Sequence, residues 1–141
     1  MIIRATTAGV HNYIANHPEV KPTFGYQAGM ADLSPLLEYP DQYIFLHDNE
    51  GAASIFEWSA PDVWQGHSMF LPRVRGKDGI RSAKAMLQWM FDYGARIIWG
   101  MTPTSEDFRR AHMFNRLIGF EACGLRTDAA GREVRLFRME R

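Results

Sequence analysis

A basic, glycine-containing stretch at residues 73–83, RVRGKDGIRSA, carries the strongest chemical signal in the sequence. Its four cations, Arg73, Arg75, Lys77 and Arg81, directly precede a run with helical apolar spacing. The first N–H groups of a helix lack intrahelical acceptors and lie at the positive end of the helix dipole, so such a loop can hold phosphate. The spacings of a Walker loop and of a Rossmann fingerprint are both absent. The stretch therefore indicates either a phosphate-binding loop of another kind or a solvated charged turn.

The elements on either side of this stretch must place a helix N-terminus beside the end of a strand. Residues 63–71 predict a strand, in which Gly66 indicates a bulge and Pro72 ends the pairing because proline has no N–H. Apolar residues recur at helical spacing from 80 to 91. Residues 96–101 contain almost no polar side chain, which is typical of a central strand covered on both faces. This succession predicts a βαβ unit.

The remaining elements lie before and after this unit in the chain. Before the unit we expect a strand at 1–6, a helix capped by Thr7 and running to His17, a loop at 21–30, a short helix at 32–38, and a hairpin of strands at 42–47 and 52–58. After it we expect a helix that is capped by Thr104 or Ser105, has its apolar stripe from Phe108 to Ile118 and ends at Gly119. A final hairpin of strands at 120–125 and 132–139 follows. The order βα(α)βββαβαββ predicts an α/β (α+β) layered fold with a mixed sheet.

Composition limits the class of protein. A chain of 141 residues fits one domain over 1–141, and its apolar runs are too short to cross a bilayer. Sixteen basic residues balance sixteen acidic ones, which argues against nucleic acid or an anionic membrane as a partner. The histidines have no metal-ligand spacing, so we expect no metal. The unpaired Cys123 favours a reducing cytoplasm and a small buried apolar role.

Two motifs within residues 69–120 occur together in one enzyme family. Pro72 and Arg75 fit the start of Pro-x-x-(Arg/Gln)-x-x-Gly-x-(Gly/Ala), with Asp78 and Ile80 at its last two defined positions. Residues 108–120 keep the alanine, the aromatic residue and the Gly-Phe pair of Asn-x-x-Ala-x-x-(Phe/Tyr)-Tyr-x-x-x-Gly-Phe. In these motifs the sequence resembles the GNAT family of acetyl-coenzyme A N-acetyltransferases. The segments LQWMFDYGARIIWGMTP (87–103) and FNRLIGFE (114–121) look particularly like small bacteriophage-encoded acetyltransferase-like proteins.

The resemblance implies a single-domain acyl-CoA N-acyltransferase-like fold, with a mixed sheet of six to seven strands flanked by helices. It also implies acetyl-CoA as co-substrate, its pyrophosphate held by backbone amides of the loop and its thioester arm lying along the preceding strand. The cofactor-binding residues that it implies are Met69, Phe70, Leu71, Arg75, Gly76, Lys77, Asp78, Gly79, Ile80 and Arg81. An N–H of Met69 or Phe70 would polarise the thioester carbonyl.

Acetyl transfer to an amine requires a neutral amine and a route for the thiolate to leave. His67, or a carboxylate such as Glu57 or Asp62, is the candidate for taking the ammonium proton, and an outward-facing strand residue is the alternative for His67. Asn115 stands where the family's tyrosine protonates the departing thiolate, and Phe108 stands where it has an asparagine. His112 is a second candidate acid, with a surface histidine as the alternative.

The sequence therefore predicts an N-acetyltransferase that acts on an amine of unknown identity, either a small molecule or a protein. The alternative is a catalytically degenerate phage protein of the same fold, acting as a virion or assembly component or binding a host factor. Asp78, Phe108 and Asn115 favour the alternative, whereas the Arg75-Gly76-Lys77 start of the loop favours the enzyme. We expect a cytoplasmic protein, in the host cytoplasm or the virion if it is phage-encoded.

Overall fold

The computed structural model describes residues 1–24 and 29–141, so the expected loop at 21–30 lies partly outside the described residues. Seven strands form one mixed sheet with the order β1-β2-β3-β4-β5-β7-β6. Their bounds are β1 Ile3–Arg4, β2 Tyr43–His47, β3 Ala52–Ala60, β4 Val63–Phe70, β5 Ile97–Pro103, β6 Glu121–Thr127 and β7 Glu133–Glu140. The helices are α1 Gly9–Ala15, α2 Lys77–Tyr93 and α3 Arg109–Leu117, with short 3₁₀ turns η1 Lys21–Phe24, η2 Ser34–Glu38, η3 Pro72–Val74 and η4 Glu106–Phe108. The predicted element order is confirmed.

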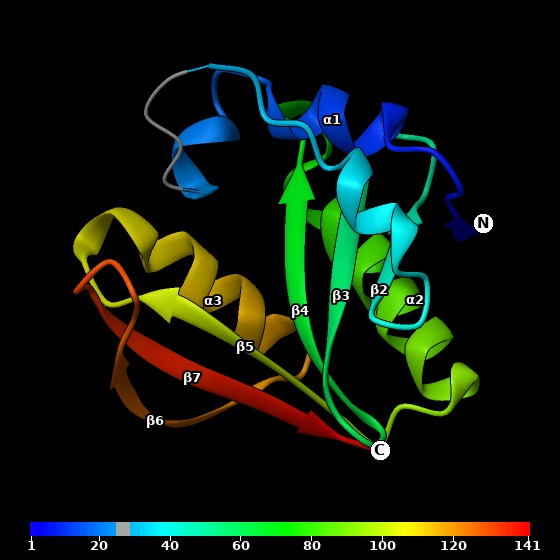
Figure 1. The fold of residues 1–141 in the computed structure, drawn as a ribbon. Coiled ribbons are helices and arrows are strands. Elements are labelled where there is room, and N and C mark those ends of the chain that lie inside the picture. The colour runs from blue at the N-terminus through cyan, green and yellow to red at the C-terminus, as the bar shows by residue number, and fades with distance from the viewer. Residues whose placement is uncertain (25–28) are drawn as a thin grey trace.

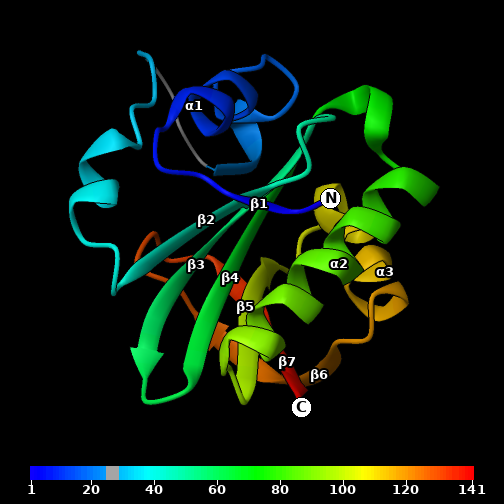
Figure 2. The ribbon, with the colours of Figure 1, turned by 90° about the vertical axis from the view of Figure 1, so that its right-hand side faces the viewer.

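The sheet separates two helical layers. Figures 1 and 2 show α1 and η2 over one face of the sheet, and α2 and α3 together over the other. Strands β2 and β3 are buried on both faces over most of their length, because α1 packs on one side of them and α2 on the other. None of the helices in the described part of the chain combines the length and apolar composition needed to cross a bilayer.

Strands β4 and β5 are parallel neighbours that stay paired over only part of their length. Their register joins Val63 to Ile97, Trp64 to Ile98 and Gln65 to Trp99. Beyond these pairs β4 continues to Phe70 and β5 to Pro103 without pairing to each other, and Figure 1 shows the two strands diverging. The β4-α2-β5 succession is the predicted βαβ unit.

The bulge expected at Gly66 is wrong. Gly66 pairs in register with Phe56, and the irregularity between β3 and β4 lies instead at Trp58 and Ala60. Gly66 is the residue at which β4 leaves β5, and a Cβ there would come within 3.3 Å of the Phe56 ring. A glycine is therefore useful at this point because the neighbouring side chain fills the space, not because the strand gains a residue.

Two burial expectations in the second half of the sheet are also wrong. Cys123 is exposed, because β6 is the edge strand and all seven of its residues are exposed. Strand β5 is not covered on both faces: Ile98 and Thr102 are buried, whereas Ile97, Trp99 and Met101 on the opposite face are only half-buried. The helical layer of α1 and η2 covers β2 to β4 and leaves that face of β5 partly open.

The N-terminal elements are shorter than expected. The first strand comprises Ile3 and Arg4, and α1 begins at Gly9 without a side-chain cap, so Thr7 does not cap it. Residues 34–38 form a 3₁₀ turn in place of the expected short helix. The side chains of Asn12 and Asn16 hydrogen-bond to the backbone at Leu33 and Ala31, which ties η2 to α1.

A buried histidine joins α1 to the sheet. His11 is fully buried, and its Nε2 lies 3.0 Å from the carbonyl oxygens of both Leu46 and Ser54. Because carbonyl oxygens only accept, Nε2 carries the proton and Nδ1, which has no partner among the described residues, does not. Burial lowers the pKa of His11 to about 4 from its ordinary value of 6.5, against the hydrogen bond to Ser54, which alone would raise it.

We predict that the unfolding free energy falls as the pH drops from 6.5 to about 4. In this range His11 binds a proton in the unfolded chain but stays neutral in the folded protein. The loss should approach about 3 kcal/mol of unfolding free energy, at about 1.4 kcal/mol per pH unit. His11→Gln should flatten this pH dependence in urea titrations, and His17→Gln serves as the control. An unchanged slope in His11→Gln would contradict the assignment.

A second polar contact ties the sheet to the start of α2. Asp48, in the turn between β2 and β3, accepts hydrogen bonds from the N–H groups of Glu50 and Ala52 and from the Ser82 hydroxyl at 2.5 Å. Burial raises the pKa of the Asp48 carboxyl, but these hydrogen bonds outweigh it and hold the pKa below its ordinary value. The stabilisation is present above pH 3.8 and is lost as the pH falls through the lowered pKa.

We predict that Asp48→Asn destabilises the protein by about 1–2 kcal/mol at neutral pH, because hydrogen bonds to a charged group are lost. The deficit measured by urea unfolding should shrink as the pH falls through the lowered pKa of the native carboxyl, because that group then also becomes neutral. Asp107→Asn, at an exposed position in η4, is the matched control. Equal stability of Asp48→Asn and the native protein at pH 7 would refute the role of this contact.

Candidate functional site

The end of β4 leads directly into an unsatisfied helix N-terminus. After Phe70, the chain makes the 3₁₀ turn η3, passes through Gly76 at φ 103°, and enters α2 at Lys77. The first helical hydrogen bond runs from the Ile80 N–H to the Gly76 carbonyl at 3.0 Å. The N–H groups of residues 76–79 precede that bond and have no acceptor in the part of the chain that the structure describes. Such a run of free amides favours an anion.

The cations of the loop are held in different ways. Arg75 donates to the Glu19 carbonyl at 3.1 Å, and Arg73 donates to the Glu50 carbonyl at 2.6 Å. These contacts fix both side chains against neighbouring segments of the chain. Lys77 is exposed beside the free amides.

Asp78 pairs with a cation within α2. Its carboxylate lies 3.6 Å from the Arg81 guanidinium, one turn further along α2, and the two side chains are 70% and 80% exposed. An ion pair this exposed contributes little to stability. The pair affects the loop electrostatically, because the positive charge of Arg81 offsets the negative charge of Asp78, the one carboxylate in the first turn of α2.

Gly79 brings the helix N-terminus close to the loop. A Cβ at this position would lie 2.8 Å from the Val74 carbonyl oxygen and 3.4 Å from the Phe70 ring. A side chain would therefore push α2 away from η3 and the strand end. The close backbone approach of helix and loop thus depends on glycine at 79.

The divergence of β4 and β5 leaves strand backbone without a strand partner. The Leu71 N–H donates to the Gly51 carbonyl, next to β3, and Ala52 pairs with Phe70. Because successive N–H groups along a strand point in opposite directions, the Phe70 N–H faces away from β3, toward the space that β5 has left. The Met69 N–H faces β3. Ser68, whose N–H points the same way as that of Phe70, is exposed.

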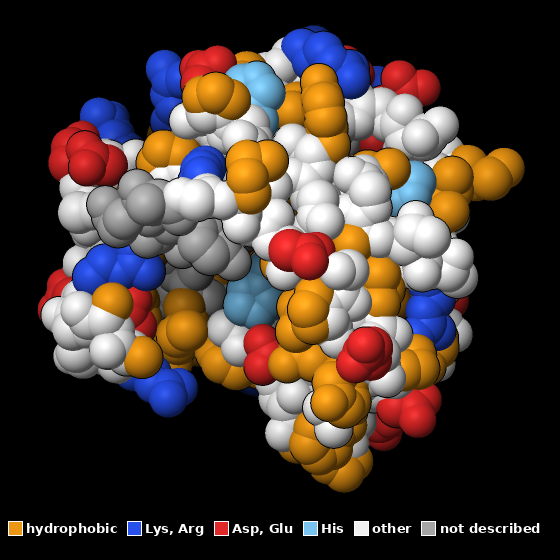
Figure 3. Space-filling model, turned by 45° about the horizontal axis from the view of Figure 1, so that its top comes forward, with side chains coloured by type: hydrophobic (Ala, Val, Ile, Leu, Met, Phe, Trp, Pro, Cys, Tyr) orange, Lys and Arg blue, Asp and Glu red, His pale blue; other side chains and the backbone are white. Residues whose placement is uncertain are grey.

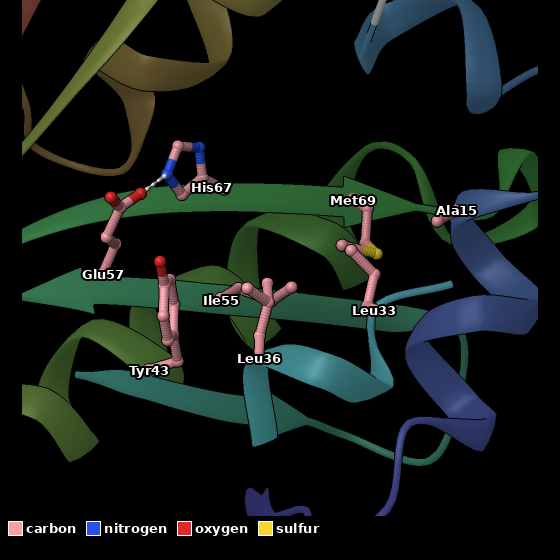
Figure 4. A pocket seen from close by; sticks show the side chains of 8 residues that line it. All are labelled: Ala15, Leu33, Leu36, Tyr43, Ile55, Glu57, His67 and Met69. Carbon is pink, nitrogen blue, oxygen red and sulfur yellow. Dashed lines mark hydrogen bonds and ion pairs between the residues drawn. The ribbon is translucent and has the colours of Figure 1, made fainter. Parts of the chain in front are cut away.

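On the sheet face beneath η2 lies a mainly apolar cavity of about 160 Å³. Figure 4 shows the side chains that line it, from α1, from η2 and the residues just before it, and from three strands: Ala15, Leu33, Leu36, Tyr43, Ile55, Glu57, His67 and Met69. Figure 3 shows hydrophobic and acidic side chains together near the centre of its view, with Lys and Arg side chains toward the margins.

Two polar side chains occupy one end of this cavity. The Glu57 Oε1 lies 3.3 Å from the His67 Nε2, and the side chains are 43% and 38% exposed. They come from neighbouring strands, since Ile55 pairs with His67 and Glu57 pairs with Gln65. His67 follows the last residues of β4 that pair with β5, so the Glu57–His67 pair lies beside the divergence.

Helix α3 borders the divergence on the other face of the sheet. The Phe114 ring contacts the Phe70 ring at a centroid distance of 5.0 Å. The Asn115 Nδ2 donates to the Thr102 hydroxyl of β5 at 2.9 Å, and the His112 Nε2 lies 2.8 Å from the Pro103 carbonyl oxygen. His112 is thus half-buried and donates its Nε2 proton to the backbone, whereas the sequence alone left open a surface position.

The structure brings together most of the side chains that the sequence singled out. Glu57 and His67 meet on one face, and residues 75–81 follow the end of the same strand. Asp62 lies apart from them, in the turn at the opposite end of β4. Among the described residues, no group of three or more His, Cys, Asp or Glu side chains could hold a metal ion.

The sequence did not identify the apolar lining of the cavity. Leu33 and Leu36 lie in the weakly patterned stretch before β2, where no periodicity marked them. Tyr43 and Ile55 could have been found by combining the predicted hairpin with strand alternation. Tyr43 and Glu57 are cross-strand partners, and Ile55 precedes Glu57 by two residues, so all three share a face.

No family model and no curated protein matches this chain in sequence. Its fold, however, matches solved acetyltransferases. A GNAT-family protein from Desulfovibrio desulfuricans superposes with a TM-score of 0.75 at 13% identity, covering 99% of this chain and 98% of that chain. Spermidine N-acetyltransferase from Vibrio cholerae, in complex with CoA and spermine, gives 0.74 at 10% identity, covering 99% and 94%. A Bacillus subtilis acetyltransferase in complex with CoA gives 0.71 at 11% identity, covering 99% and 97%.

At these identities the likeness establishes the fold. The seven-stranded mixed sheet with its flanking helices is the acyl-CoA N-acyltransferase fold of the GNAT proteins, as the sequence motifs implied.

Proposed function

We propose that this protein is an N-acetyltransferase that transfers the acetyl group of acetyl-CoA to an amine. The observation that carries the proposal is the joint placement of two features on one strand. Strand β4 leaves β5 after Gln65, and its far end leads into free helix amides at 76–79. The first feature offers a slot for a thioester arm and the second an anion site. Solved proteins of this fold with CoA bound support the same ligand.

In the proposed complex the coenzyme pyrophosphate accepts hydrogen bonds from the amides of Gly76, Lys77, Asp78 and Gly79. Arg75 and Lys77 flank these amides, and Arg81 offsets the Asp78 carboxylate. Ile80 follows in the first turn of α2, half-buried against the core. The pantetheine arm lies along the end of β4, where Phe70 and Leu71 supply backbone and Met69 faces the acceptor side.

The proposed reaction forms one C–N bond and breaks one C–S bond. The amine nitrogen approaches from the Glu57–His67 side, and that pair takes the ammonium proton and passes it to solvent. The neutral nitrogen attacks the thioester carbonyl carbon, while the Phe70 N–H stabilises the oxyanion. The CoA thiolate leaves and takes a proton from solvent, while the nitrogen, cationic after its attack, releases its second proton to solvent as the amide forms. An amide such as Asn115 can hydrogen-bond a thiolate but carries no acidic proton, so in this scheme it orients the arm.

We predict that acetyl-CoA binds this chain, as measured by titration calorimetry, and raises its unfolding free energy by about 2.7 kcal/mol at a concentration of one hundred times Kd. Arg75→Ala combined with Lys77→Ala should weaken binding about tenfold or more, because charge-assisted phosphate contacts are lost. Lys84→Ala, exposed further along α2, is the matched control and should bind as the native protein does.

Absence of acetyl-CoA binding at millimolar concentration would contradict the proposal. It would favour the alternative of a catalytically inactive protein of this fold, such as a virion component or a host-factor-binding protein. If the variant that combines Arg75→Ala with Lys77→Ala binds acetyl-CoA as tightly as the native protein does, the pyrophosphate must lie elsewhere.

A further prediction concerns proton removal. Glu57→Gln and His67→Ala should each lower kcat/KM for thiol release with small amines by about 10²–10⁴, the range of general base catalysis. Acetyl-CoA affinity should stay unchanged, since both side chains lie on the acceptor face. Full activity in both variants would exclude the pair as the base.

A further inference from the structure

We propose that the acceptor is a primary amine carried on one uncharged, ring-sized apolar group, such as an arylmethyl or branched-alkyl amine. This inference rests on the proposed function and specifies the substrate class of its acceptor site. The geometry that points to it is the cavity beneath η2, which is apolar along its length and polar at the end beside the β4–β5 divergence.

The size of the cavity sets the size of the apolar group. Its volume is about 160 Å³. An apolar cavity of about 150 Å³ in another protein admits one benzene molecule and stays dry without it. The same volume here therefore accommodates one aromatic ring or a branched chain of similar bulk.

The chemistry of the lining sets the character of that group. Six of the eight lining side chains, from Ala15, Leu33, Leu36, Ile55, Met69 and Tyr43, are aliphatic, a thioether or aromatic. Ile55 and Met69 are buried, at 5% and 3% exposure, so the floor is part of the core. A charged or strongly polar group placed there would lose its hydration without a partner.

The polar end sets the position of the amine. Glu57 is the one acid among the eight lining residues, and none of the eight is Lys or Arg. The charge of one ammonium group is thus balanced by one carboxylate. The carboxylate of an amino acid would instead be repelled by Glu57, with no Lys or Arg among the lining residues to balance its charge. The Tyr43 ring, cross-strand from Glu57, covers the same end.

The two ends are oriented correctly for transfer. His67 lies two residues beyond Gln65, the last β4 residue paired with β5, and Met69 lies further along β4 toward α1. An amine bound with its apolar group against Leu36 and Met69 therefore presents its nitrogen to Glu57 and His67. From there the nitrogen faces the divergence in which the thioester is proposed to lie.

The experiment measures amine binding and acetyl transfer separately. Calorimetry of the protein without coenzyme tests binding of benzylamine, with 4-(aminomethyl)benzoate, ethanolamine and spermidine as comparison ligands. Thiol release from acetyl-CoA with the same four amines tests turnover. We expect benzylamine to bind at least tenfold more tightly than each of the other three, and to give the highest kcat/KM.

Variants assign the binding to this cavity. Leu36→Trp should fill the cavity and weaken benzylamine at least tenfold, while acetyl-CoA affinity is kept. Leu125→Trp, on exposed strand β6, is the matched control for the added indole. Glu57→Gln should weaken benzylamine about tenfold and leave the uncharged benzyl alcohol unaffected, because hydrogen bonds to charged groups are the stronger class.

The outcomes separate the two hypotheses. Benzylamine binding that Leu36→Trp abolishes, without thiol release from any amine, would support the amine cavity and refute acetyl transfer. Thiol release with ethanolamine or spermidine at rates equal to or above those of benzylamine would support acetyl transfer and overturn this inference. Benzylamine binding that is unchanged in both Leu36→Trp and Glu57→Gln would also overturn it.

Discussion

The parallel pairing of β4 with β5 ends after three residue pairs, and the arrangement of the candidate site depends on that limit. A strand inside a sheet has its backbone N–H and C=O groups satisfied on both sides. Once β5 departs, β4 keeps β3 on one side and presents unpaired backbone on the other. The cavity beneath η2 borders this opening on one face of the sheet and α3 borders it on the other, so the proposed reaction takes place across the opening.

Two close contacts hold the start of α2 beside the sheet, near the opening between β4 and β5. The Asp48 carboxylate holds α2 to the β2–β3 turn through Ser82, and Gly79 lets the helix start lie against the Val74 carbonyl. On the opposite face, His11 joins α1 to the carbonyls of β2 and β3, and the asparagines of α1 hold η2 over the cavity. The start of α2 and the helical layer over the cavity are therefore attached to the same two strands, β2 and β3, by separate contacts.

Much of the fold follows from local patterns in the sequence. The amphipathic period of residues 80–91 and the compact strand at 42–47 were enough to predict α2 and β2, because each element buries one continuous set of apolar side chains. The free amides at 76–79 were anticipated by a glycine and cations before a helix. The bulge at Gly66 failed because a strand glycine can also accommodate a neighbouring ring, here that of Phe56.

The cavity beneath η2 was harder to predict, since it depends on register. The register between β3 and β4 shifts at Trp58 and Ala60, and beyond this shift Glu57 pairs with Gln65. Glu57 and His67 therefore lie on the same face of the sheet. A register slip of one residue would place them on opposite faces. The lining from Leu33 and Leu36 comes from a turn positioned by long-range asparagine contacts, which no local period encodes. Exposed Cys123 likewise reflects the place of β6 at the sheet edge, a property of topology.

The central claim is that one coenzyme molecule lies along the end of β4 with its pyrophosphate on the start of α2. Backbone amide NMR during a titration with CoA tests it most directly, since each N–H reports separately. We expect the largest shifts at Gly76 to Gly79 and at Ser68 and Phe70, with a smaller shift at the Met69 amide, which faces β3. Shifts confined to other parts of the chain, with residues 76–79 unmoved, would contradict it.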